Sequence, residues 1–260
     1  MLSGVKAKEF LQSICSNDLS SLKPGSSISA AFLDRFGKVL AVSCIYNLED
    51  QYLIESDLPA HQKLFSYLKD LIGFSNCKVG DMSREFSVFI LFGLDGFSSI
   101  SNKEILCISN PLLKKLEIFA DGSFKKEFLE KGISEMKKEE WEEFRIENKI
   151  PEFGKDYDSS YLVLELGLDN LISYTKGCYT GQEIVARMKS YGGQTPRKIV
   201  KMEFDLTGEI EENEKLFKEG QEAGFITSVG KGICLATVKK EFFEKGTVLE
   251  TLKKIKLVIQ

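Results

Sequence analysis

The stretch Lys176-Gly-Cys-Tyr-Thr-Gly-Gln-Glu183 has the pattern of a loop that delivers a cysteine to the start of a helix. Thr180 and Glu183 have the spacing of a capping box, which predicts that Thr180 is the N-cap. Cys178 then lies just before a helix N-terminus, with Lys176 two residues earlier. Both features favour the thiolate form of a cysteine.

Two glycines, Gly177 and Gly181, flank the cysteine and predict unusual backbone dihedrals or the close approach of another group. The ordinary alternative is a capped helix beside a buried cysteine, because most lone cysteines behave as small hydrophobes. Spacing alone leaves both interpretations open.

The literal string K-G-C-Y-T-G-Q-E resembles the signature of the YgfZ family of folate-binding proteins, which act in iron–sulfur protein maintenance. These proteins are relatives of the glycine-cleavage T-protein (aminomethyltransferase). Residues 141–154 are similar to the family segment W-x-x-x-R-I-E-x-G-I-P-x-x-G, and residues 10–18 to an F-L-Q…N-D segment near the family's start. The resemblance covers essentially the whole chain.

The pattern of elements agrees with an α+β fold. Helices are predicted at about 5–14, 59–72, 123–133 and 137–148, with strands at 29–34, 38–46, 52–55, 86–92, 105–108 and 115–120. After residue 196, five short strands between glycines and charged turns predict a small antiparallel barrel or sandwich. The resemblance implies a T-protein-like folate-binding core of two α/β subdomains at 1–195 and a C-terminal β-barrel at 196–260. A strand that the family has before its first helix is expected to be missing.

Composition excludes several classes of function. The net charge is −4 and the lysines alternate with acids, so direct nucleic-acid binding is not expected. No apolar run could span a bilayer and no secretory signal is recognisable, so the expected location is cytoplasmic, without membrane attachment. The six cysteines form no C-x-x-C pair and the chain has one histidine, which argues against a metal site. Three of these cysteines lie in strand-like segments and are predicted to be core residues: Cys44, Cys107 and Cys234.

The resemblance implies a pterin pocket at the sole tryptophan. An aromatic plane beside a carboxylate suits a flat polar heterocycle, with stacking on the ring and N–H donors bound by the acid. Trp141 and Glu147 are therefore expected to bind tetrahydrofolate or a one-carbon derivative, with Arg145 beside them. Cys178 is the expected reactive thiol. The motif residues expected to support it are Lys176, Gly177, Tyr179, Gly181, Gln182, Glu183 and Arg187.

Three functions follow as alternatives. The first is a folate-dependent factor for assembly or repair of iron–sulfur enzymes, including tRNA-modifying ones, with iron–sulfur proteins or their assembly factors as partners. The second is a folate-dependent, aminomethyltransferase-like one-carbon transferase. Ala41 and Val42 stand where T-proteins carry acids, so glycine-cleavage activity is disfavoured. The third is a non-catalytic binding module.

Overall fold

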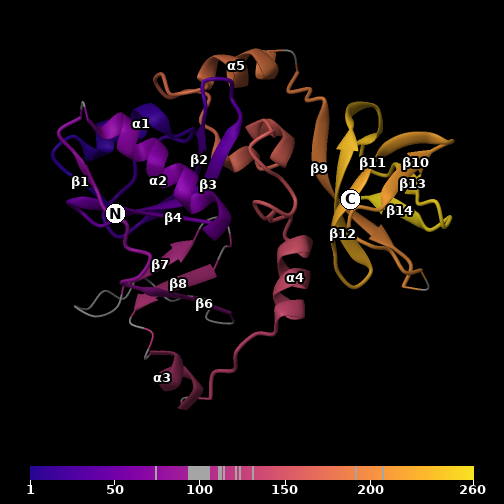
Figure 1. The fold of residues 1–260 in the computed structure, drawn as a ribbon, viewed down its shortest axis with the longest axis horizontal. Coiled ribbons are helices and arrows are strands. Elements are labelled where there is room, and N and C mark those ends of the chain that lie inside the picture. Colours follow the sequence, from indigo (N-terminus) through magenta and orange to yellow (C-terminus); the bar gives the residue numbers. More distant parts are fainter. Residues whose placement is uncertain are drawn as a thin grey trace. The chain divides into compact units, whose positions relative to one another are not determined.

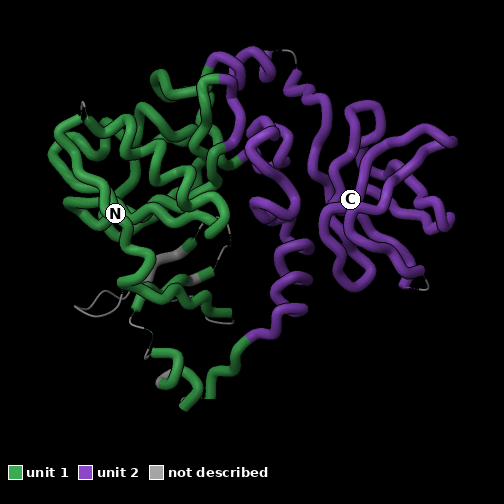
Figure 2. Tube along the Cα trace, viewed as in Figure 1, with its two compact units in different colours: residues 1–35, 40–135, 170–182 green, residues 36–39, 136–169, 183–260 purple. Residues whose placement is uncertain are grey.

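The computed structural model describes residues 1–73, 75–92, 106–110, 113, 115–120, 122, 124–130, 132–190, 192–206 and 208–260. The chain forms two compact units, each built from several stretches of sequence (Figure 2). Unit 1 contains residues 1–35, 40–135 and 170–182, and unit 2 contains residues 36–39, 136–169 and 183–260. The predicted domain boundary at residues 195 and 196 stays a prediction.

Unit 1 has a five-stranded sheet with the order β2-β3-β4-β1-β5 and the helices α1 and α2 (Figure 1). The apolar residues of α1 recur every three or four positions, and this stripe is the buried side of the helix. All nine residues of β3 are buried. The elements are β1 (Leu2–Ser3), α1 (Ala7–Ile14), β2 (Ser27–Leu33), β3 (Val39–Asn47), β4 (Gln51–Ser56), α2 (Leu58–Ile72) and β5 (Lys78–Val79).

A second sheet of unit 1 has three strands in the order β6-β8-β7, and both pairings are antiparallel. Its members are β6 (Ser87–Leu91), β7 (Leu106–Asn110) and β8 (Lys115–Ala120), followed by α3 (Phe124–Glu130). These positions confirm the three strands predicted from their apolar runs. The prediction that Cys107 is a core residue falls on a side chain outside the described part of the chain.

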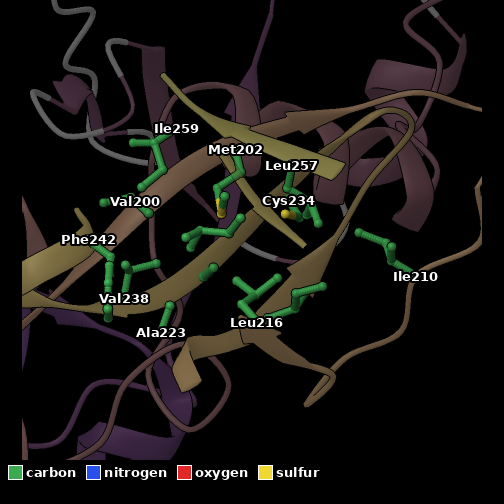
Figure 3. Close-up of a cluster of buried hydrophobic side chains, with 13 residues drawn as sticks. Val200, Met202, Ile210, Leu216, Ala223, Cys234, Val238, Phe242, Leu257 and Ile259 are labelled. Atoms are coloured by element: carbon green, nitrogen blue, oxygen red, sulfur yellow. The ribbon is translucent and has the colours of Figure 1, made fainter. Parts of the chain in front are cut away.

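Unit 2 contains α4 (Lys138–Glu147) and a closed antiparallel barrel with the order β10-β11-β12-β9-β14-β13. The barrel strands are β9 (Arg197–Phe204), β10 (Lys215–Lys218), β11 (Gln221–Val229), β12 (Ile233–Lys239), β13 (Val248–Glu250) and β14 (Lys256–Ile259). Apolar side chains from all six strands fill its interior (Figure 3). The buried members of this core are Val200, Met202, Ile210, Leu216, Ala223, Ile226, Cys234, Ala236, Val238, Phe242, Leu249, Leu257 and Ile259. The α+β fold with a C-terminal β-barrel is therefore confirmed.

Two predictions about strands are wrong. The barrel has a sixth strand, β10, whose four residues Lys-Leu-Phe-Lys are too short and too charged at the ends to show period-two alternation. The strand expected to be missing before the first helix is present as β1, where Leu2 pairs with Tyr52 of β4 and Val79 of β5. Two residues are too few to carry a periodic signal, and the neighbouring strands define this one.

Candidate functional site

Cys178 is the exposed cysteine of the thiol loop, a name we give to residues 170–181. Among the cysteines whose side chains the structure describes, three are buried, one is half-buried and only Cys178 is exposed. The buried ones are Cys15, Cys44 and Cys234, and the half-buried one is Cys77. Burial raises the pKa of the Cys234 thiol to about 12 and also raises that of Cys44. Cys44 and Cys234 are thus core residues, as predicted.

Lys176 is buried, and its ammonium points at the end of α1. Its Nζ donates to the backbone oxygens of Gln12 at 2.7 Å, Cys15 at 2.8 Å and Asn17 at 2.7 Å. Burial lowers the pKa of this lysine. These contacts give Lys176 a structural role that its sequence position did not reveal, and its effect on the Cys178 thiol stays a prediction.

The start of α5 (Gln182–Ser190) differs in detail from the predicted capping box. The side chain of Gln182 reaches back to the Tyr179 N–H, with Oε1 at 3.3 Å, so this contact starts one residue earlier than the predicted Thr180–Glu183 pair. Gly181 has φ 81°, which confirms the unusual dihedral expected there. Gly177 lacks a positive φ and has open space around its Cα, so the strain or close approach expected at this glycine is absent.

Glu183 and Arg187 pair with each other on the surface of α5. The Arg187 Nη2 and Glu183 Oε1 atoms are 2.7 Å apart, and both side chains are exposed. An exposed pair at this spacing contributes only a few tenths of a kcal/mol to helix stability. Their predicted role in shaping the surroundings of Cys178 stays a prediction.

Trp141 lies half-buried on α4 and stacks on the next aromatic residue of the same helix face. The ring centroids of Trp141 and Phe144 are 5.8 Å apart, with 27° between the planes. Trp141 and Phe144 therefore form an aromatic pair, a surface that suits the stacking of a flat heterocycle, and the pterin pocket itself stays a prediction.

Glu147 ends α4 with an exposed side chain, and its Oε1 accepts from Lys201 Nζ of β9 at 2.7 Å. It lies six positions after Trp141, so the two side chains leave the helix about 120° apart around its axis. The carboxylate is available to N–H donors, but α4 does not place it on the face that carries the indole.

Arg145, also predicted to contact folate, is buried in a network of hydrogen bonds and ion pairs within unit 2. Its guanidinium is 1% exposed and is hydrogen-bonded to Glu142, Asp156 and Ser228, the contacts to the Asp156 carboxylate and the Ser228 hydroxyl both being 2.6 Å. At least four of its five N–H donors are engaged in this way. Asp156 also accepts from the Thr227 hydroxyl at 2.5 Å. Arg145 thus ties α4 to β11 inside unit 2, and we correct its expected role from ligand contact to structural ion pair.

Unit 1 contains a cavity of about 200 Å³, lined by residues of β4, α2, β5 and the following segment. His61 lies in its wall with Nε2 3.1 Å from Asp81 Oδ2, and Glu55 lies in it too. Its walls are mostly apolar, from residues such as Leu64 and Phe86. No sequence motif predicted this cavity, because its lining residues come from several separate segments and none of these segments has a recognisable pattern of polar residues.

Two kinds of structural feature are absent from the described residues. No group of three or more His, Cys, Asp or Glu side chains in this part of the chain could hold a metal ion. No helix there is long and apolar enough to cross a membrane.

Comparison with known proteins identifies the fold. No protein-family model matches the chain. A chloroplastic protein of Arabidopsis thaliana named as a transferase is 23% identical over 259 residues, 89% of this chain and 59% of its own length. The mitochondrial iron–sulfur cluster assembly factor IBA57 homolog of Mycosarcoma maydis is 25% identical over 231 residues, 80% of this chain and 55% of its own length. The chain thus spans little more than half the length of these curated relatives.

The solved structure of the glycine cleavage system aminomethyltransferase T from Bartonella henselae superimposes with a TM-score of 0.86 at 18% identity, over 100% of this chain and 81% of that one. The chain therefore has the aminomethyltransferase (T-protein) fold, and its sequence relatives include a protein named as a transferase and an iron–sulfur cluster assembly factor.

Proposed function

We propose that the protein binds tetrahydrofolate or a one-carbon derivative and acts in the assembly or repair of iron–sulfur enzymes, including tRNA-modifying ones, with Cys178 as its reactive thiol. The observation that carries the proposal is the exposure of Cys178 in a glycine-flanked loop. Buried cysteines are inert, whereas a thiol that reacts must reach its partner. The likeness to an iron–sulfur cluster assembly factor supports the same assignment, as does the resemblance of the motif to the YgfZ signature.

Replacing Cys178 tests this role. The Cys178→Ser variant should fail to restore iron–sulfur enzyme activity in cells that lack the protein, while folding as the parent does. Cys77→Ser is the matched control because that thiol is half-buried and outside the loop. Full restoration by Cys178→Ser would overturn the proposed role and leave a non-catalytic binding module as the better description.

The residues of α4 suit a folate ligand in part. Trp141 offers an aromatic surface and Glu147 an exposed carboxylate that can accept from pterin N–H groups. Arg145 does not fit, since its donors are engaged within unit 2. Bound tetrahydrofolate would supply one-carbon chemistry, the indole of Trp141 would stack on its ring, and Glu147 would accept from it at a different side of α4.

The sole tryptophan makes binding measurable. Titration with tetrahydrofolate should quench the Trp141 fluorescence saturably, and Glu147→Gln should weaken the affinity by about tenfold or more through loss of hydrogen bonds to a charged group. Glu143→Gln, an exposed neighbour on the same helix, should leave the affinity unchanged. Absence of quenching up to the solubility of the ligand would contradict folate binding at α4.

A folate-dependent one-carbon transferase is the second candidate, supported by the relative named as a transferase and by the fold. Ala41 is fully buried and Val42 is 8% exposed, and neither can exchange a proton where the resemblance places the acids of T-proteins. A substrate other than the lipoyl arm would therefore be needed. Turnover of methylene-tetrahydrofolate by the purified protein would favour this candidate over the first.

We further propose a cytoplasmic protein whose partners are iron–sulfur proteins or their assembly factors, without direct nucleic-acid binding. The mixed surface charge and the net charge of −4 support the last point. Copurification of such a partner with the parent, and its loss with Cys178→Ser, would test the assignment of partners.

A further inference from the structure

We propose that Lys176 is a positioning residue for Cys178: its ammonium fixes the thiol loop on the carbonyl end of α1 and so holds the exposed thiol in place. The inference rests on the proposed function in that Cys178 is taken as the reactive group. In this proposal Lys176 holds the loop in place. Its position two residues before Cys178 had instead suggested that its charge favours the thiolate form of the cysteine.

The geometry at the end of α1 carries the argument. The last carbonyls of a helix have no partners within the helix, and they carry the negative end of its dipole. Lys176 Nζ donates to the Gln12 carbonyl in the last turn of α1, to the carbonyl of the C-cap Cys15 and to the Asn17 carbonyl of the following turn, at 2.7 to 2.8 Å. An ammonium has three hydrogens, so these three acceptors use all of them. The lysine thus acts as a C-cap supplied from a segment about 160 residues further along the chain.

Burial makes this contact specific. Lys176 is 8% exposed, and an ammonium removed from water is tolerated only when hydrogen bonds replace its hydration. The ring of Tyr179 lies 5.1 Å from Nζ, which adds a cation–π contact from the same loop. Losing the ammonium would remove the donor that Lys176 supplies to the Gln12, Cys15 and Asn17 carbonyls and would weaken the attachment of the loop at this point.

Further hydrogen bonds attach the loop on both sides of the cysteine. The Ser16 hydroxyl donates to Leu171 O at 2.5 Å, and the Asn17 amide donates to Asn170 O at 2.8 Å. On the other side of Cys178, the Thr180 N–H donates to Ser13 O at 3.2 Å. Gly177 and Cys178 lie between these attachments and stay exposed.

The early F-L-Q…N-D segment supplies the platform for these contacts. The Gln12 side chain donates to Asp18 Oδ1 at 2.8 Å and accepts from the Leu19 N–H at 2.7 Å, which fixes the turn after α1. Asn17 donates to Ser29 O of β2 at 2.8 Å as well as to the thiol loop. The two motifs therefore form one structure, in which the first holds the second.

Three lysine variants separate positioning from electrostatic activation. Lys176→Met removes the ammonium, and Lys176→Arg keeps the charge but presents a planar fork that cannot meet three convergent carbonyls. Lys6→Met is the control, since it removes an exposed lysine at the other end of α1. Three quantities are measured on the full chain. The first is amide hydrogen exchange at Thr180 and at Ser173, whose N–H donates to Ser16 O at 3.0 Å. The others are the pH profile of Cys178 alkylation by iodoacetamide with peptide mapping, and iron–sulfur enzyme activity in cells.

If Lys176 positions the loop, both Lys176→Met and Lys176→Arg should speed exchange of the two amides by about tenfold or more, as local opening predicts. Alkylation of Cys178 should become faster at every pH without a shift of the profile along the pH axis, and cellular activity should fall. Lys6→Met should match the parent. If instead the profile moves to higher pH in Lys176→Met only, while exchange is unchanged and Lys176→Arg behaves as the parent, the positioning role is overturned.

Asn17→Ala is a second route to the same test, because it cuts another attachment of the loop without changing its charge. It should speed exchange in the same direction as Lys176→Met, and unchanged exchange in it would contradict the platform role of the α1 turn. The outcome is separable from that of the proposed function. Should Cys178→Ser keep full cellular activity, the reactive-thiol proposal fails, while exchange and alkylation still report on the attachment of the loop.

Discussion

Tyr46, Glu55 and Glu117 form an acidic cluster in unit 1, in which Tyr46 and Glu117 are fully buried and Glu55 is half-buried. The Tyr46 hydroxyl is hydrogen-bonded to both carboxyl groups, with Glu55 Oε2 at 2.8 Å, and Asn110 donates to Glu117 Oε1 at 2.9 Å. A phenol has one hydrogen, so one of its two contacts requires a protonated carboxyl as donor. Burial, with the charge of Glu117 second, raises the pKa of Glu55 to about 8.

This shift predicts a pH dependence of stability. A carboxyl whose pKa is raised in the folded state contributes stability that is complete below its unfolded value of 4.5 and is lost as the pH rises towards about 8. Glu55→Gln should remove that loss, so the unfolding free energy of the variant should increase relative to that of the parent as the pH rises through this window. Urea unfolding at several pH values measures this, with exposed Glu85→Gln as the control. If the unfolding free energies of Glu55→Gln and the parent vary in parallel with pH, the raised pKa of Glu55 is contradicted.

The buried Arg145–Asp156 pair predicts a large effect on stability. Removing one partner leaves an uncompensated buried charge, so Arg145→Met or Asp156→Asn should lower the unfolding free energy by about 3 to 5 kcal/mol. Arg187→Met removes an exposed arginine from a surface pair and should change it by about 0.5 kcal/mol or less. Urea unfolding followed by circular dichroism compares them, and equal small effects would refute the structural role of Arg145.

At the scale of elements, the barrel depends on a glycine where two strands approach closely. A Cβ at Gly224 of β11 would lie 2.1 Å from the Thr237 carbonyl oxygen of β12, closer than any contact allows. Gly224→Ala should therefore disrupt this strand pairing and cost about 3 kcal/mol or more. Gly73→Ala, which has open space and helical dihedrals, should be tolerated. Thermal unfolding measures both, and a parent-like melting temperature for Gly224→Ala would contradict the close approach.

At the scale of the whole molecule, the chain passes repeatedly between the two units. Unit 1 takes residues 170–182 from the second half of the chain, where Lys176 binds α1, and unit 2 takes residues 36–39 from the first half, where the Val39 N–H donates to Tyr161 O at 2.9 Å. Each unit is thus completed by a segment from the other half of the sequence.

This interleaving predicts that a cut chain stays together. Residues 132–137 are exposed and connect α3 to α4, so a protease site inserted after Ser134 should be tolerated and cleaved. The two fragments should comigrate in size-exclusion chromatography and separate only in denaturant. An inserted site in the exposed turn at 252–254 is the control, because both sides of that cut belong to unit 2. Separation of the large fragments in native buffer would refute the interleaving.

The sequence by itself determined the elements whose signal is local. The apolar stripe of α1, the unbroken apolar run of β3 and the glycine-separated barrel strands each follow from side-chain periodicity, which the backbone geometry imposes on neighbouring residues. The adjacent glycines predicted a loop around Cys178, but spacing alone left open whether the thiol is exposed or buried.

The tertiary structure alone decided where Lys176 and Arg145 point, that β10 closes the barrel, and that Glu55 and Glu117 meet. Lys176 and its acceptors are about 160 residues apart, and Arg145 and Ser228 are 83 apart. Local patterns report only which side of an element is apolar. A buried charge chooses its partner from whichever donors and acceptors the packed chain brings within about 3 Å, and no spacing in the sequence encodes that choice.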